Sequence, residues 1–85
     1  MAIYELLYKP SVAKDLRGLP KADIRRILAR TEALRTNPRP VGSEKLAGSE
    51  QYRIRQGNYR ILYTIDDTQV IVEVVKIGHR KDVYR

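Results

Sequence analysis

The sequence contains no cysteine, so no disulfide framework supports its fold and its chemistry suits a reducing compartment. No apolar run approaches the roughly 18 residues of a membrane-spanning helix, and the first five residues show no basic stretch followed by an apolar one. We therefore expect a cytoplasmic protein that is neither exported nor embedded in a membrane. With 85 residues, we expect one domain over residues 1–85 and a core small enough that a partner chain could be needed.

Acidic residues are scarce, with ten Asp and Glu against seventeen Lys and Arg. The net charge is +7 and the isoelectric point is near 10.0. Most of the positive residues are arginine, whose planar guanidinium group binds phosphate through two hydrogen bonds. A polyanion is the expected partner, although charge alone does not separate RNA, DNA and acidic protein from a merely solvated basic surface.

Hydrophobic periodicity predicts an N-terminal strand over residues 3–8 and a short helix that begins at Pro10 and ends near Gly18. A second, amphipathic helix closes at Asn37-Pro38. The sequence is compatible with one short strand around residues 44–46. Three further strands are expected over residues 52–55, 59–65 and 70–77. The apolar stripe of the second helix consists of Ile24, Ile27, Leu28, Thr31 and Leu34.

This element order predicts an α+β fold. We expect two N-terminal antiparallel helices packed on one face of a small, twisted, mainly antiparallel β-sheet. The other face of that sheet is expected to remain partly open.

Three arginines alternate with apolar residues in the expected hairpin. Side chains alternate across a strand, so Arg53 and Arg55 share one face, and Arg60 on the next strand lies opposite its apolar neighbours. If the apolar set packs on the helices, the three guanidinium groups converge on the open face. They would suit a phosphate, while a solvent-exposed strand face whose arginines only keep the protein soluble is the alternative interpretation of this local feature.

The C-terminal residues combine a histidine, cations and a tyrosine. His79 is the one side chain whose usual pKa, about 6.5, suits proton transfer at neutral pH, although a lone histidine is more often structural. RNA is cut when its own 2′-hydroxyl attacks the adjacent phosphorus, which needs a proton acceptor, a proton donor and cations. The sequence offers all three kinds of group.

Metal and nucleotide chemistry find little support. Asp66-Asp67 suit a hairpin turn, Glu73 stands alone, and no histidine pair has ligand spacing. The sequence also lacks a P-loop, a dinucleotide-binding fingerprint and a nucleophile elbow. We expect no metal and no cofactor.

Two runs of the sequence together carry a family resemblance. They are Tyr52-Arg53-Ile54-Arg55 with Gly57-Asn58-Tyr59-Arg60-Ile61-Leu62-Tyr63, and Ile77-Gly78-His79-Arg80 with Val83-Tyr84. These runs strongly resemble RelE-type toxins of the RelE/ParE superfamily, and the likeness covers nearly the whole chain. The resemblance implies a toxin of a bacterial or archaeal toxin–antitoxin pair that enters the ribosomal A site, cleaves the bound mRNA and halts translation. A cognate antitoxin would wrap and silence it.

The resemblance also implies roles for single residues. Arg53 and Arg55 take the places of basic residues that hold RNA and assist proton transfer. Arg60 takes the place of the arginine that stabilises the transition-state phosphate. Arg80 matches the arginine proposed to protonate the leaving group, and Tyr84 matches the tyrosine that stacks on a base.

The general base stays open, because the best-studied members carry lysines in the Arg53 and Arg55 region. Arginine is a poor proton acceptor, since its pKa exceeds about 12. His79 could be the base, or it could only orient the C-terminal residues. Lys45 and Lys81 are expected, with Arg53, to bind RNA.

Two other functions compete with RNA cleavage. One is a ParE-like toxin that shares the fold and inhibits gyrase by binding it, against which the pairing of Arg80 with Tyr84 argues. The other is a non-catalytic module that binds RNA or a partner protein through the basic surface. Fold similarity alone excludes neither, since function resides in the site.

Overall fold

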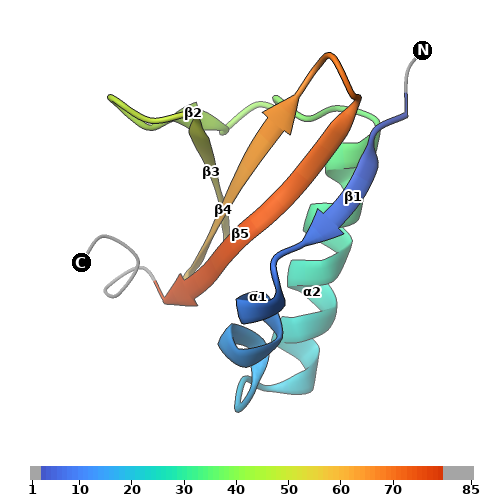
Figure 1. Ribbon diagram of the computed structural model, residues 1–85. Helices are drawn as coiled ribbons and strands as arrows, with labels where there is room; N and C mark the ends of the chain where they lie inside the picture. Colours follow the sequence, from blue (N-terminus) through green and yellow to red (C-terminus); the bar gives the residue numbers. More distant parts are fainter. Residues whose placement is uncertain (1–2, 80–85) are drawn as a thin grey trace.

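The computed structural model describes residues 3–79. Helices lie on one side of a twisted sheet (Figure 1), which confirms the α+β fold expected from the sequence. Arg80, Lys81 and Tyr84 lie outside the described residues. The elements are β1 (Glu5–Tyr8), α1 (Pro10–Leu16), α2 (Lys21–Glu32), the 3₁₀ turn η1 (Ala33–Arg35), β2 (Glu44–Lys45), β3 (Gln51–Gln56), β4 (Tyr59–Asp66) and β5 (Ile71–His79).

The sheet has the strand order β1-β5-β4-β3-β2. Strands β2 to β5 form the expected antiparallel meander, whereas β1 pairs with β5 in parallel. A parallel pair needs a crossover connection, and here the crossover includes both helices. The first strand of the chain therefore becomes a sheet edge beside the last one (Figure 1).

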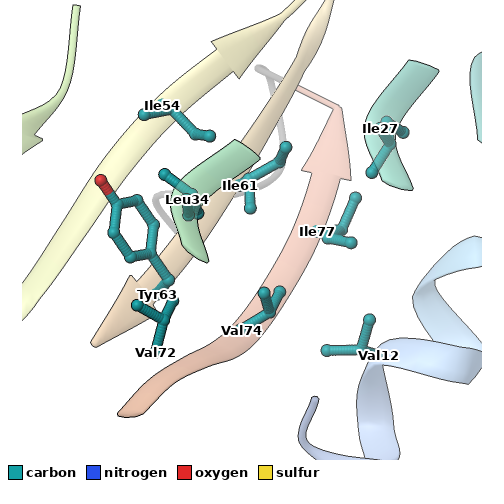
Figure 2. Close-up of a cluster of buried hydrophobic side chains, with 9 residues drawn as sticks. All are labelled: Val12, Ile27, Leu34, Ile54, Ile61, Tyr63, Val72, Val74 and Ile77. Carbon is teal, nitrogen blue, oxygen red and sulfur yellow. The ribbon is translucent and has the colours of Figure 1, made fainter. Parts of the chain in front are cut away.

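The core lies between the sheet and the helices (Figure 2). Ile54 of β3 and Ile61 and Tyr63 of β4 come from alternate positions and are fully buried, as the alternation predicted. Ile27 of α2 and Leu34 of η1 cover them. The arginines that alternate with these core residues therefore lie on the face of the sheet away from the helices. The other buried members of the cluster are Val12, Val72, Val74 and Ile77.

The helices follow the predicted pattern with two differences. Helix α1 ends at Leu16, two residues before Gly18, whose φ of +88° glycine adopts without strain. Leu28 belongs to the predicted apolar stripe but is not part of the core: the residue is 38% exposed and lines a shallow groove with Val12 and Leu16. Among the described residues, neither helix has the length and apolar character needed to span a bilayer.

Candidate RNA-binding face

Arg55 and Arg60 occupy opposite positions of one hairpin. Their Cα atoms are register partners between β3 and β4, one pair away from the Gln56–Tyr59 pair that closes the turn. Gly57 forms the turn with a φ of +60°, in the left-handed region that glycine favours. The two arginines, Gly57 and Tyr59 line a small hollow at this end of the sheet. Two guanidinium groups beside each other suit an anion with several acceptor oxygens, such as a phosphate.

Arg53 lies one step further along the same face and has an acidic neighbour. It is the register partner of Leu62 on β4 and of Glu44 on β2. Its guanidinium Nη2 donates to the Glu44 carboxylate, and the Arg53 side chain is only 15% exposed. The open face therefore carries the three predicted arginines, but Glu44 competes for one of them.

Lys45 lies apart from this group. It pairs with Tyr52 on β3, and Tyr52 packs against the core, so alternation places Lys45 on the opposite face from Arg53. Its ammonium group is 3.9 Å from the carboxylate of Glu50, at the outer edge of the sheet. The structure does not bring Lys45 together with the arginines.

His79 ends β5 opposite Tyr59, and its ring turns toward the helix side. The centroids of the two rings are 6.1 Å apart and their planes are at 80°, an edge-to-face contact. Tyr59 packs against the core, whereas Arg60, opposite Gly78, belongs to the other face. His79 thus lies at the same end of the sheet as Arg55 and Arg60, but its ring and the Arg60 guanidinium lie on different faces.

A β-bulge explains this placement. Leu62 lies opposite Lys76 but Tyr63 lies opposite Val74, so β5 contains one extra residue between them. The extra residue reverses the alternation, which is why both Val74 and Ile77 are buried in the core. Position 79 follows Ile77 onto the helix side.

The structure adds an acidic residue that sequence reasoning missed. The Tyr59 hydroxyl donates to Oδ2 of Asp23 over 3.1 Å, and Arg26 donates to Oδ1 over 3.3 Å. Burial, and then the hydrogen bond to Asp23, raise the pKa of Tyr59 above its usual value, so the hydroxyl stays a donor at neutral pH. In the sequence Asp23 is only another charge at the start of a helix, 36 residues from Tyr59.

Acidic residues elsewhere have structural partners. Oδ1 of Asp66 accepts hydrogen bonds from the backbone N–H groups of Thr68 and Gln69, at 3.0 and 2.9 Å, and Asp67 pairs with Arg39. Asp67 lies in the turn, as predicted, while Asp66 is the last residue of β4 and its carboxylate accepts hydrogen bonds from the turn. Within residues 3–79, no three His, Asp or Glu side chains gather in a way that could hold a metal ion.

Three comparisons with known proteins indicate the same family. Residues 6–84 match the family described as ParE toxin of type II toxin-antitoxin system, parDE. Toxin RelG of Mycobacterium tuberculosis is 34% identical, over 96% of this chain and 97% of its own. The archaeal RelE-RelB complex from Pyrococcus horikoshii contains a chain of 30% identity with a TM-score of 0.83, covering 95% of this chain and 99% of that one. The toxin-antitoxin complex RelBE2 from Mycobacterium tuberculosis gives 25% identity and a TM-score of 0.82, covering 92% and 99%.

Proposed function

This chain belongs to the RelE/ParE superfamily of type II toxins, and we propose that it inhibits translation by cleaving mRNA in the ribosomal A site. The observation that supports the proposal most directly is the register pairing of Arg55 with Arg60 on the open face. Two arginines that line one hollow would suit an RNA phosphate, whereas binding to gyrase gives them no evident role. The net charge of +7 suits a ribosomal RNA environment as well as the mRNA itself.

The proposed reaction is attack of the 2′-hydroxyl on the adjacent phosphorus, with departure of the 5′-oxygen. The phosphate gains negative charge in the transition state, and in this proposal Arg55 and Arg60, which are register partners, offset that charge without a metal ion. Arg80, as proton donor to the leaving oxygen, and Tyr84, as a base-stacking residue, remain proposals carried over from the family. Because the His79 ring lies on the helix side, we assign it the orienting role rather than that of general base.

We further propose that a cognate antitoxin binds and silences the chain in the cytoplasm. Two of the similar structures are complexes of a RelE or RelBE2 toxin with its antitoxin. Ten acidic residues against seventeen basic ones leave a surface that an acidic segment would complement.

The test adds purified toxin to ribosomes programmed with mRNA and maps new 5′ ends by primer extension. Cuts confined to the A-site codon, lost in Arg60→Ala but kept in Arg25→Ala, are the expected result. Arg25 is an exposed arginine of α2, so its replacement removes the same charge far from the open face.

The second candidate is gyrase inhibition, which the match to a ParE family favours. An absence of cuts together with unimpaired translation would contradict the cleavage proposal. Inhibition of DNA supercoiling by the same preparation would then establish the ParE-like activity.

A further inference from the structure

The last residues of β5 are held by one acidic side chain from each helix. The backbone N–H of Ile77 donates to Oδ2 of Asp15, in α1, over 3.0 Å. The ring of His79 rests against Tyr59, whose hydroxyl donates to Asp23 in α2 over 3.1 Å. These contacts join segments 62 and 36 residues apart in the sequence.

These contacts take the place of a missing strand. The pairing of β1 with β5 stops at Tyr8 and Val74, where the N–H of Lys9 donates to the Val74 carbonyl over 2.9 Å. Beyond Val74, β5 therefore continues to His79 with β4 as its strand partner on one side only. An edge of this kind exposes backbone N–H groups, and Asp15 accepts the hydrogen bond that a neighbouring strand would otherwise accept.

The same contacts fix the orientation of the His79 side chain as well as the position of the end of β5. The bulge in β5 turns His79 toward the helices, and the Tyr59 ring meets it there edge to face. Asp23 holds the Tyr59 hydroxyl, and Arg26 holds the other oxygen of Asp23. In the sequence, Arg80 follows His79 directly.

We propose that Asp23, Tyr59 and Asp15 form a clamp of positioning residues that fixes the end of β5 for RNA cleavage. The inference rests on the proposed function and deepens it, because the clamp fixes residues 77–79 at the end of the sheet where Arg55 and Arg60 are register partners. Asp15 and Asp23 lie in the helices, and Tyr59, which also lines the hollow with Arg55 and Arg60, is given a positioning role through its contact with His79. They act through the backbone and ring at the end of β5.

The test replaces Tyr59 by Phe, which keeps the ring but removes the hydrogen bond to Asp23. Tyr4→Phe is a matched control, because the Tyr4 hydroxyl donates to Asp67 over 2.7 Å at the β4–β5 turn, the opposite end of the same strands. Tyr59→Phe is expected to lower kcat about tenfold, with KM and antitoxin affinity changed less than about twofold. The control keeps its kcat.

A second pair of variants separates the hydrogen bond from the charge. Asp23→Asn keeps an oxygen that accepts the Tyr59 hydroxyl hydrogen, so its kcat is expected to stay within about twofold of the unmodified chain. Asp23→Leu is expected to behave like Tyr59→Phe. If both Tyr→Phe variants lose kcat in proportion to their loss of stability, the hydrogen bond is merely structural and the positioning role is wrong.

Amide hydrogen exchange of residues 76–79 provides a measurement that does not depend on cleavage. Exchange at these residues is expected to be about fivefold faster in Tyr59→Phe, as for the loss of one hydrogen bond, and unchanged in Tyr4→Phe. If the unmodified chain cuts no RNA, the proposed function fails, while exchange still decides whether the clamp fixes β5. Equal exchange in both variants would overturn the clamp.

Discussion

Arg55 and Arg60 lie directly opposite each other at the closed end of the β3–β4 hairpin, on the face of the sheet away from the helices. Side chains at opposed positions of an antiparallel pair have Cβ atoms about 5 Å apart. The turn at Gly57 and the buried Ile54 and Ile61 beside them hold this register. Two cations are therefore brought together by the fold before any ligand arrives.

If both arginines stabilise the same phosphate, their contributions to cleavage are coupled. We expect Arg55→Ala and Arg60→Ala each to lower the single-turnover rate on programmed ribosomes about 100-fold. The rate of the double variant is expected to fall by much less than the product of the two single effects. Loss of one arginine already misplaces the phosphate that the other arginine contacts. Strictly multiplicative losses would show that the two side chains act at separate sites.

Glu44 is expected to weaken RNA binding, because its carboxylate pairs with the Arg53 guanidinium group and competes with a phosphate for it. The two residues are register partners, and their side chains form an ion pair in which the Arg53 side chain is mostly buried. Glu44→Gln should lower the dissociation constant for a single-stranded RNA about two- to threefold and steepen its salt dependence by roughly one phosphate contact. Glu50→Gln, which removes the same charge near Lys45, is the control. Equal effects of both variants would indicate a response to net charge alone.

Asp67 contributes stability that depends on pH. It accepts hydrogen bonds from Arg39 over 2.9 Å and from Tyr4 over 2.7 Å, and the hydrogen bond from Arg39, followed by that from Tyr4, holds its pKa below the usual 3.8. A carboxyl group with a lowered pKa in the folded state stabilises the fold above its unfolded pKa, and this stability is lost as the pH falls through the folded value.

Asp67→Asn is accordingly expected to lower the melting temperature at pH 7. The difference from the unmodified chain should shrink as the pH falls below about 4, which thermal unfolding between pH 7 and pH 2.5 would measure. A difference that stays constant over this range would mean that the ion pair with Arg39 does not contribute.

Val70 occupies a strained backbone position before β5. Its φ is +60°, in a region that a β-branched residue rarely adopts. Such strain costs of the order of 1–3 kcal/mol, and asparagine tolerates this conformation better. Val70→Asn should therefore raise the free energy of unfolding by about 1 kcal/mol, or about 4–8 °C in melting temperature. Val70→Ile, which keeps the branched Cβ, should bring no gain, and equal stabilisation by both variants would exclude relief of strain.

Local patterns were enough to predict the covered face of the sheet and the arginines of the open face. Alternation from Tyr52 to Tyr63 places Ile54 and Ile61 in the core, and a period of two is a property of neighbouring residues in any strand. The 3.6-residue period of α2 predicted the burial of Ile27 in the same way. It misplaced Leu28, because the width of the buried stripe depends on what packs against the helix.

The sequence by itself thus determined the fold class, the basic charge and the arginines of the hairpin, since each depends on composition or on spacing along one strand or helix. Only the tertiary structure decided that β1 pairs with β5, that Glu44 forms an ion pair with Arg53, and that Asp23 accepts a hydrogen bond from Tyr59. Alternation counted from Val72 and Val74 would even have placed His79 on the arginine face. One extra residue in β5 reverses it, because a bulge shifts every later side chain to the other face of the sheet.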